Sequence, residues 1–265
     1  MSVKVGNFFR KLFCPKSVYE RRHELSAYWA SEFGGTFRYG PLAGLRIGSH
    51  QSWSSGDLAA KLFGIYEQEV LAEILRLAPR FDTLIDVGAA DGYYAVGTLK
   101  ANLFKRCIAF ETNKASRDNV RVVAGDNGVS DRLTLHSEAS TESLLSIATT
   151  HASEDLLFLV DIEGGEFDIL TTDVFKCFDA SAFIIELHDW MLDGGPQMKA
   201  NLIANISATH VITSVTNDVR DLNGRVELAH KNDDHRWLIC SEGRGRQMEW
   251  LVCEPGLSEG TVVHG

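Results

Sequence analysis

Short apolar runs and stretches of helical periodicity alternate along most of the chain. Seven of the apolar runs are predicted to be β-strands: Thr83 to Val87, Arg106 to Phe110, Leu133 to His136, Leu156 to Val160, Ala182 to Leu187, His210 to Val215 and Trp237 to Cys240. Several are apolar at nearly every position, which is typical of strands buried on both faces beneath helices. The pattern therefore predicts a doubly wound α/β fold with a mostly parallel sheet, whose ligands bind beyond the carboxyl ends of the strands.

The chain before the first strand has a different pattern. Residues 34 to 56 are rich in Gly and Ser with short alternating apolar positions, which indicates a hairpin and a loop. A helix that ends before Pro79 is predicted next, because apolar residues recur at helical spacing at Phe63, Tyr66, Val70, Ile74 and Leu77. These features divide the chain into an N-terminal helical and hairpin extension, residues 1 to 58, and one α/β domain, residues 59 to 265.

The first 25 residues carry six Lys or Arg and two Glu, which predicts a basic amphipathic helix. Its apolar face is formed by Val5, Phe8, Phe9, Leu12 and Phe13. Such a helix most often packs its apolar stripe on the neighbouring domain. Weak contact with an anionic membrane surface is the alternative for the same pattern.

Length and charge restrict the class of protein. With 265 residues and 45% hydrophobic composition, the chain can bury one substantial core. Its net charge of -10 and pI near 5.4 argue against binding of nucleic acid through backbone phosphates, which requires a concentrated excess of Lys and Arg. A small neutral or cationic molecule is a more compatible partner.

Cysteine usage and hydropathy bear on the cellular compartment. The chain contains Cys14, Cys107, Cys177, Cys240 and Cys253. No two of them form a CxxC pair, so we expect reduced thiols rather than disulfides or a zinc site. No apolar run is long enough to span a bilayer, and the N-terminus lacks the apolar region of a signal peptide. A soluble cytoplasmic protein is therefore expected, and the sequence gives no indication of its oligomeric state.

The first predicted strand leads into a glycine turn, in the segment LIDVGAADGYY. Gly88 and Gly92 lie four residues apart on either side of Ala89, and glycines allow a sharp turn and a close approach of the backbone to a ligand. The segment lacks the GxGxxG pattern of dinucleotide-binding turns. Asp86 is an unfavourable neighbour for phosphates but a favourable one for the cationic methionine end of S-adenosylmethionine (SAM). Taken alone, the segment is equally compatible with a plain strand-to-helix turn.

Two further features follow at the ends of the next strands. Glu111 ends the second strand, 25 residues after Asp86, where a carboxylate can accept hydrogen bonds from both hydroxyls of a ribose. Glu138 and Ala139 follow the third strand, where they can frame the edge of an adenine. Three such features in order on consecutive strands predict a cofactor that contains adenosine.

With these motifs the chain resembles class I SAM-dependent methyltransferases and, among them, the FkbM-like family. The resemblance spans about residues 60 to 190 and is carried by YEQEV (66 to 70), LIDVGAADGYYAVG (84 to 97), IAFE (108 to 111), NGVSDRLTL (127 to 135), VDIEGGEFDIL (160 to 170) and IIELHD (184 to 189). Its most specific part is DIEGGE, which is similar to the DxEGxE signature of the family.

The resemblance implies a Rossmann-like fold with seven strands and transfer of a methyl group, typically to an oxygen of a sugar, polyketide or other small metabolite. By position it also implies that Asp86, Gly88, Gly92 and Glu111 are cofactor residues, whereas Glu138 and Ala139 match less distinctly.

Candidate catalytic residues follow the fourth and fifth strands. Asp161 and Glu163 come after the fourth strand, and Glu186, His188 and Asp189 come after the fifth, so both groups are predicted to meet at one rim of the sheet. Methyl transfer from a sulfonium requires orientation of the acceptor and removal of its proton. His188 is the predicted general base, because an imidazole changes charge near neutral pH and Glu186 or Asp161 can orient it. Asp161 is also expected to contact the cofactor.

Two other interpretations of this cluster stay open. The carboxylates and His188 also form a candidate site for Mg²⁺ or another divalent ion that lowers the pKa of an acceptor hydroxyl. Alternatively, His188 is a structural residue that caps the end of a strand through hydrogen bonds. A base without a metal is favoured, because Glu163 and Glu166 have the positions expected at the start of a helix.

The sequence therefore predicts an O-methyltransferase that acts on a hydroxyl of a small metabolite, sugar or glycan. An N-methyltransferase acting on a small amine is one alternative, since it requires the same cofactor site but no strong base. A non-catalytic SAM-binding module is another. A nicotinamide-dependent oxidoreductase is disfavoured by the missing GxGxxG pattern.

Peripheral segments supply further predictions. Residues 189 to 197 form a loop at the rim, with Trp190 and Met191, and are a candidate lid over the acceptor. Residues 217 to 235 are crowded with charges and are predicted to be solvated surface. Trp237 and Trp250 are predicted to complete the core.

Overall fold

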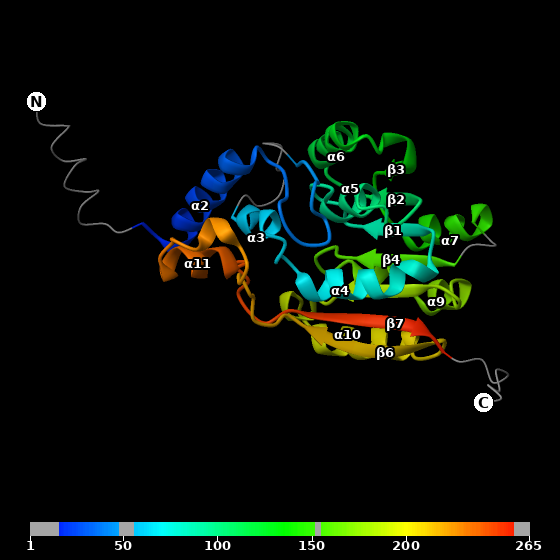
Figure 1. The fold of residues 1–265 in the computed structure, drawn as a ribbon. Helices are drawn as coiled ribbons and strands as arrows, with labels where there is room; N and C mark the ends of the chain where they lie inside the picture. Colours follow the sequence, from blue (N-terminus) through cyan, green and yellow to red (C-terminus); the bar gives the residue numbers. More distant parts are fainter. Residues whose placement is uncertain (1–15, 48–55, 152–154, 257–265) are drawn as a thin grey trace, which may run out of the picture.

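A seven-stranded β-sheet runs through the centre of the computed structural model, which describes residues 16–47, 56–151 and 155–256 (Figure 1). The order of the strands is β3-β2-β1-β4-β5-β7-β6. The strands β1 to β5 pair in parallel, whereas β7 is antiparallel to both of its neighbours, β5 and β6. The strands are β1 Thr83–Val87, β2 Arg106–Phe110, β3 Leu133–His136, β4 Leu156–Val160, β5 Ala182–Glu186, β6 His210–Thr216 and β7 Glu249–Pro255.

Helices cover both faces of the sheet. One hydrophobic cluster joins α4, α5 and α6 to the face that contains Leu84 of β1, and a second joins α7, α9 and α10 to the face that contains Ile85 and Val87. These helices, with the short α8, are α4 Gln68–Leu77, α5 Tyr93–Lys100, α6 Lys114–Asn127, α7 Thr141–Thr150, α8 Glu166–Ile169, α9 Thr172–Cys177 and α10 Gly195–Ile206. The predicted Rossmann-like, doubly wound and mostly parallel sheet is therefore confirmed.

The pairing of the strands brings their carboxyl ends to one edge. Val87 at the end of β1 is paired with Phe110 of β2 on one side and with Val160 of β4 on the other. Val160 is in turn paired with Ile185 of β5. The residues that follow β1, β2, β4 and β5 therefore meet along one rim of the sheet.

An additional helical layer precedes the sheet. Helices α2 (Val18–Phe33) and α3 (Leu58–Leu62) lie beside α11 (Asp233–Cys240), as Figure 1 shows. Trp29 of α2 donates a hydrogen bond from its indole nitrogen to Nε2 of His235 in α11, at 3.0 Å. The buried apolar side chains of α2, Leu25, Trp29 and Phe33, belong to the same hydrophobic cluster as those of α4 to α6. This layer extends the core of the α/β domain, and the predicted boundary after residue 58 stays a prediction.

Two N-terminal predictions fall partly outside the described residues. The apolar face predicted for the basic helix, Val5 to Phe13, lies outside them, and the first described helix, α2, begins at Val18. Within the segment predicted to be a hairpin and loop, Thr36 and Arg46 form an isolated antiparallel bridge. Residues 48–55 of the same segment are not among those described.

One predicted strand is wrong. Trp237 to Cys240 lie in helix α11, and the seventh strand of the sheet is β7. The side chain of Asn232 caps the helix by accepting a hydrogen bond from the N–H of His235, and two acidic residues occupy the first turn. Trp237 is 79% exposed, so the prediction that it completes the core is also wrong. Trp250 in β7 is buried, as predicted.

The helix predicted over Phe63–Leu77 begins later than its apolar spacing suggests. The α4 helix starts at Gln68, because Gly64 forms a turn with a positive φ of 67°. A Cβ at Gly64 would stand 2.3 Å from the carbonyl oxygen of Tyr39, so another residue cannot fit there without movement of the backbone. This turn leaves Glu67 outside the helix, where it lines the site described below.

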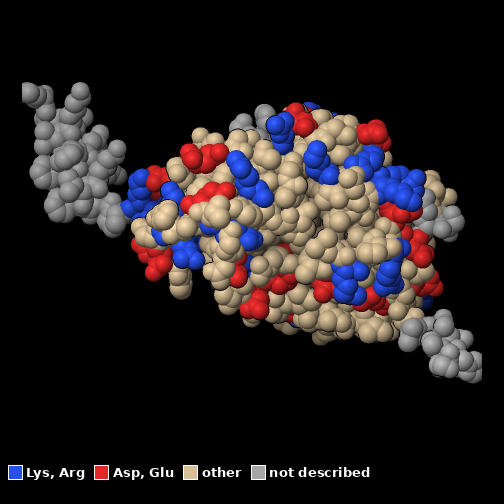
Figure 2. Space-filling model, viewed as in Figure 1, with Lys and Arg blue, Asp and Glu red and all other residues tan. Residues whose placement is uncertain are grey.

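The surface has mixed charge on the face seen in Figure 2, where Lys and Arg side chains lie among Asp and Glu side chains. Within the described residues, no helix combines the length and apolar character needed to cross a membrane. The described cysteines, all of them free thiols, are Cys107, Cys177, Cys240 and Cys253.

Candidate functional site

A cavity of about 670 Å³ opens at the carboxyl edge of β1, β2 and β4. Much of its wall is formed by segments at or after the ends of strands, which are residues 87–91, 110–112, 137–140 and 161–163. Another part of the wall comes from upstream of the sheet and contains Lys61, Tyr66 and Glu67. The cavity has the size of a small-molecule site and lies where doubly wound sheets bind their ligands.

The turn after β1 brings two backbone segments into close contact. Gly88 has a φ of 106°, and a Cβ there would stand 1.8 Å from the carbonyl oxygen of Asp161. The N–H groups of Gly88 and Ala89 both donate to the carbonyl of Phe110, at 2.9 and 3.0 Å. Glycine is therefore required at position 88, where the ends of β1, β2 and β4 meet.

Gly92 has a different environment from the one that the motif predicts. It precedes α5 with a φ of 85°, and a Cβ there would lie 3.1 Å from the side chain of Val96. Gly92 does not line the cavity, whereas its neighbours Ala90 and Asp91 do. The positive φ accounts for the glycine through backbone conformation, and direct contact with a cofactor stays a prediction.

Asp86 lies behind the glycine turn, outside the set of residues that line the cavity. It is 2% exposed, and its Oδ2 atom has no hydrogen-bond partner among the described residues. Burial, and to a lesser extent the charges of Glu111 and Asp91, raise the pKa of Asp86. A hydrogen bond from the backbone N–H of Ala95 lowers it, and the net pKa is about 7. Asp86 is thus a buried carboxyl group that titrates near neutral pH.

Glu111 lines the cavity at the end of β2, the position that the sequence predicts for a ribose ligand. Its Oε2 atom accepts a hydrogen bond from the N–H of Ala90 at 2.9 Å, and its Oε1 atom accepts one from the N–H of Asn113 at 2.7 Å. Each carboxylate oxygen retains capacity for a further donor. Glu138 and Ala139 line the same cavity. The structure therefore brings the predicted ribose and adenine residues together around one space.

The predicted catalytic residues Asp161, Glu186 and His188 meet at the rim. The Nε2 atom of His188 lies 3.6 Å from Oδ1 of Asp161, 3.6 Å from Oε2 of Glu163 and 4.0 Å from Oε1 of Glu186. Ligand atoms of Asp161, Glu186 and His188 all lie within 4.8 Å of one another, a spacing compatible with a metal ion. Asp161 and Glu163 line the cavity, whereas His188 and Glu186 are buried behind them.

Glu166 holds His188 in place, a role that the sequence analysis missed. Its Oε1 atom accepts a hydrogen bond from the backbone N–H of His188 at 2.8 Å and lies 3.2 Å from Nδ1 of the same residue. Its Oε2 atom accepts a hydrogen bond from the N–H of Gly164 at 2.8 Å. When Nδ1 carries the ring proton and donates a hydrogen bond to Glu166, Nε2 is unprotonated and faces Asp161 as a hydrogen-bond acceptor. The DIEGGE motif contains Glu166, but its position at the start of a helix suggested only a capping role.

The environment of the rim raises the pKa values of its titratable groups. Loss of hydration raises the pKa of Asp161, and the negative charge of Glu67 raises it further. Burial and the charge of Asp161 likewise raise the pKa of Glu186. Burial alone lowers the pKa of His188, but the hydrogen bond to Glu166 and the surrounding carboxylates raise it above 6.5 overall. The rim therefore holds groups suited to proton exchange near neutral pH.

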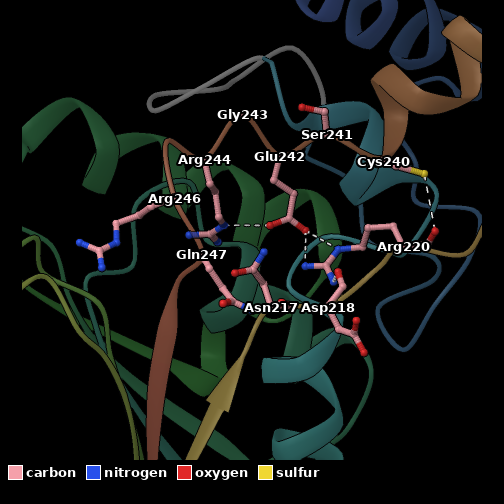
Figure 3. Close-up of a pocket in the computed structure, with 10 residues that line it drawn as sticks. All are labelled: Asn217, Asp218, Arg220, Cys240, Ser241, Glu242, Gly243, Arg244, Arg246 and Gln247. Atoms are coloured by element: carbon pink, nitrogen blue, oxygen red, sulfur yellow. Dashed lines mark hydrogen bonds and ion pairs between the residues drawn. The ribbon is translucent and has the colours of Figure 1, made fainter. Parts of the chain in front are cut away.

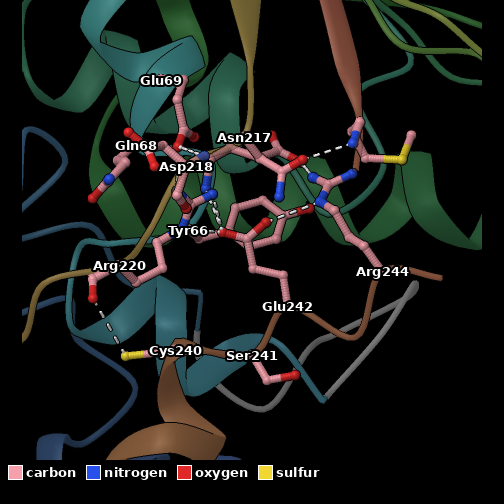
Figure 4. A network of polar contacts seen from close by, with 12 residues as sticks. Tyr66, Gln68, Glu69, Asn217, Asp218, Arg220, Cys240, Ser241, Glu242 and Arg244 are labelled. Carbon is pink, nitrogen blue, oxygen red and sulfur yellow. Dashed lines mark hydrogen bonds and ion pairs between the residues drawn. The ribbon is translucent and has the colours of Figure 1, made fainter. Parts of the chain in front are cut away.

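Arg244 fixes Glu186 from the opposite side. Its Nη1 atom donates to Oε1 of Glu186 at 2.9 Å, and its Nη2 atom forms an ion pair with Glu67. Its Nε atom donates to Oε2 of Glu242 at 2.9 Å, a contact seen in Figure 4. The indole nitrogen of Trp250 donates to Oε2 of Glu186 at 3.2 Å. Because both oxygens of Glu186 are hydrogen-bonded, this residue anchors the rim.

A second hollow, of about 370 Å³, lies beside this network (Figure 3). One of its lining residues, Arg220, pairs with Glu242 at 2.7 Å and also with Glu69. The Arg220 side chain is only 4% exposed, so the prediction of solvated surface over residues 217–235 is wrong for this residue. In Figure 3, Arg246 points away from the contact between Arg244 and Glu242. Arg220 and Arg244, which both pair with Glu242, connect this hollow to the residues that hold Glu186 at the rim.

The loop predicted to be a lid begins with a 3₁₀ turn, Asp189–Met191. The side chains of Trp190 and Met191 are both partly exposed. The guanidinium of Arg246 lies 5.5 Å from the ring centroid of Trp190, within the range of a cation–π contact. A role for this loop as a lid stays a prediction.

Comparisons with known proteins reveal distant structural similarities. No family model and no curated protein match the sequence. The O-methyltransferase from Bacillus cereus in complex with S-adenosylhomocysteine (SAH) is 11% identical, with 95% of this chain and 97% of that chain covered and a TM-score of 0.46. The O-methyltransferase TomG from Streptomyces achromogenes, involved in tomaymycin synthesis and in complex with SAM, is 11% identical, with 96% of each chain covered and a TM-score of 0.48. A ribosomal protein L11 methylase from Lactobacillus delbrueckii subsp. bulgaricus is 14% identical, with 80% of this chain and 86% of that chain covered and a TM-score of 0.46.

Proposed function

We propose that this chain is a SAM-dependent methyltransferase that methylates a hydroxyl oxygen of a small metabolite, sugar or glycan. One observation carries the proposal: a single cavity is lined by the turn at Gly88, by the anchored Glu111 and by Asp161, which stands in front of His188. These residues follow three different strands and supply the separate functions that methyl transfer requires, namely cofactor binding and proton removal.

The cavity suits a ligand with an adenosine at one end and a positive charge at the other. Glu111 is anchored by two backbone N–H groups and offers its remaining lone pairs to the ribose hydroxyls. Glu138 and Ala139 are assigned to the adenine. The same wall contains further acidic side chains, among them Asp91 and Glu163, which suit a positively charged ligand. When bound, SAM supplies a methyl group on a positively charged sulfur.

Proton removal is assigned to Asp161 and His188. Asp161 lines the cavity, and Nε2 of His188 lies 3.6 Å behind its carboxylate. The pair would accept the proton of the acceptor hydroxyl as the oxygen bonds to the methyl carbon; the bond from that carbon to the sulfonium sulfur would break with its electrons left on sulfur, giving SAH and a methyl ether. Glu166 keeps the imidazole oriented with Nε2 toward Asp161. Groups with pKa values raised toward neutrality are effective proton acceptors under physiological conditions.

A transfer assay tests the proposal. The purified protein is incubated with SAM that carries a tritiated methyl group and with fractionated hydroxylated metabolites and glycans, and labelled products are identified by mass spectrometry. We expect the label in a methyl ether. Label on nitrogen would establish the N-methyltransferase alternative, and SAH binding without transfer to any fraction would support a non-catalytic module. Absence of SAH binding in calorimetry would refute the proposal, and hydride transfer with NAD would replace it.

A metal-assisted reaction is the second candidate, because Asp161, Glu186 and His188 converge closely enough to hold an ion. Carboxylate oxygens are the ligands that Mg²⁺ prefers. However, the positively charged Arg244 donates to Oε1 of Glu186, the oxygen that faces Nε2 of His188, and its charge would repel a cation there. A base without a metal is therefore our proposal. Chelation should leave activity unchanged, whereas a metal-dependent enzyme would lose activity with EDTA and regain it with Mg²⁺.

A further inference from the structure

The charges that line the cavity are strongly unbalanced. Its acidic lining residues are Glu67, Asp91, Glu111, Glu138, Asp161, Glu163 and Asp168. Among the described residues of the wall, Lys61 is the one with a positively charged side chain. Lys61 belongs to α3, upstream of the sheet and outside the motifs that follow the strands.

Lys61 has hydrogen-bonding capacity that the described residues do not fill. It is 4% exposed, and its Nζ atom donates to Oδ2 of Asp91 at 3.0 Å. Asp57 lies 3.9 Å away, which is an ion-pair distance too long for a hydrogen bond. The ammonium also lies 4.8 Å from the ring centroid of Tyr66 and 5.2 Å from that of Tyr93. An ammonium has three donors, so two of them have no acceptor among the described residues.

The ammonium remains charged despite its burial. Burial alone lowers the pKa of Lys61, but the carboxylates of Asp91 and Asp57 raise it above its ordinary value. A buried cation with unfilled donors is costly unless a ligand supplies acceptors. Lys61 therefore marks a place in the cavity wall where an anionic oxygen would be stabilised.

We infer that Lys61 binds the carboxylate of an amino-acid moiety in the ligand, which is the methionine end of SAM and of SAH. This inference rests on the proposed function and assigns the part of the cofactor that lies beside α3. Asp91, which Lys61 contacts, belongs to the glycine turn that lines the cavity. Lys61 therefore joins the upstream helix to the cofactor turn and adds a contact specific to the amino-acid end.

The surrounding acids explain why a carboxylate fits better than a phosphate. One ammonium amid Asp91, Glu67 and Asp57 cannot offset the charge of a doubly negative phosphate group. An α-amino acid carries an ammonium beside its carboxylate, so its positive group is attracted by the same acids. The arrangement is therefore complementary to a zwitterion.

The experiment compares two ligands that differ only at the amino-acid end. SAH contains this moiety, and methylthioadenosine keeps the adenosine and the thioether but lacks it. Isothermal titration calorimetry measures both ligands on the wild type and on Lys61→Met. We expect Lys61→Met to weaken SAH about 10- to 100-fold, as loss of a charge-assisted hydrogen bond should, and to change methylthioadenosine by less than about threefold.

Two control variants make the result specific. Lys100→Met removes a positive charge from the exposed end of α5 and should leave both ligands unaffected. Lys61→Arg keeps the charge and should retain part of the selectivity for SAH. An equal loss for both ligands in Lys61→Met would show a structural role, and an unchanged SAH affinity would also overturn the inference.

Wild-type measurements separate this inference from the proposed function. If the wild type binds neither ligand, the proposed function fails. If it binds both ligands equally well, the function stands and the role of Lys61 fails. Where Lys61→Met leaves Asp91 and Asp57 unpaired and unfolds the protein, Lys61→Arg decides the matter: a selective weakening of SAH supports the inference, and an equal change for both ligands overturns it.

Discussion

Asp86 gives the clearest quantitative prediction, because this buried carboxyl has a pKa of about 7 and an oxygen without a hydrogen-bond partner among the described residues. The perturbation is Asp86→Asn, which keeps the shape of the side chain and removes its titration. We expect the variant to gain stability relative to the wild type as the pH rises. The physical reason is that the folded protein resists ionisation of this group whereas the unfolded chain does not.

The magnitude follows from the two pKa values. The folded value of about 7 exceeds the ordinary value of 3.8, and about 1.36 kcal/mol per pH unit gives a maximal penalty of about 4 kcal/mol. Below about pH 4 both states keep the proton, so the penalty is absent. Between about pH 4 and pH 7 the unfolded chain releases the proton first, so stability falls as the pH rises. Above about pH 7 both states are ionised and the penalty is constant.

The assay is urea denaturation of the ligand-free protein at pH 5 and pH 8. The stability of Asp86→Asn relative to the wild type should rise by about 2.5 kcal/mol between these values. Any fixed cost of the asparagine amide cancels in this difference. Ile85→Val, in the same buried strand, should give a change in stability that is equal at both pH values. A pH-independent difference for Asp86→Asn would refute the reasoning.

The remaining predictions concern the cavity and the rim. Glu111→Ala should weaken SAH by about 1.5 to 3 kcal/mol in calorimetry, and an unchanged affinity would place the ribose elsewhere. His188→Ala should keep SAH affinity within about threefold and lower turnover by a factor on the order of 10² or more, and Asp161→Asn should also lower turnover; full activity of both would exclude this pair as the base. The kcat/KM of the wild type should rise with pH above 6.5 as His188 loses its proton, and Glu166→Gln should move this rise to lower pH, because Glu166 raises the pKa of His188. Gly92→Val should lower stability through strain at the positive φ and contact with the core, and unchanged urea denaturation would show that the turn tolerates a side chain.

The strands of the sheet and the part of the cavity around Glu111 could be predicted because their signals are local. A strand such as Thr83–Val87 is buried on both faces, so its apolar run is continuous and short. Glu111 was found by its place at the end of β2, and parallel pairing brings that end beside the end of β1. Periodicity and strand order were therefore sufficient to predict where these residues lie in the fold.

The seventh strand shows where local signals fail. The chain contains two similar apolar runs, one that begins at Trp237 and one that begins at Trp250. A run of four apolar residues is compatible with a strand or with one turn of helix. The difference lies in the flanks, because Asn232 and the acids after it start a helix, whereas Trp250 pairs with Glu186 in the sheet. The helix cap was the stronger signal for the first run.

The rim around His188 was less predictable because its residues are fixed by contacts between distant parts of the chain. Arg244 contacts Glu67 across 177 positions and Glu186 across 58 positions. It lies between α11 and β7, beyond the segment that carries the family resemblance. Glu186 looked like a partner for His188 by sequence, but Arg244 and Trp250 occupy both of its oxygens. Asp161 and Glu163, which both line the cavity, are thus the carboxylates beside Nε2 of His188 that are exposed to a ligand. Changes at Arg244 should accordingly alter turnover, whereas the affinity for SAH, which the proposed function assigns in part to Glu111, should stay near that of the wild type.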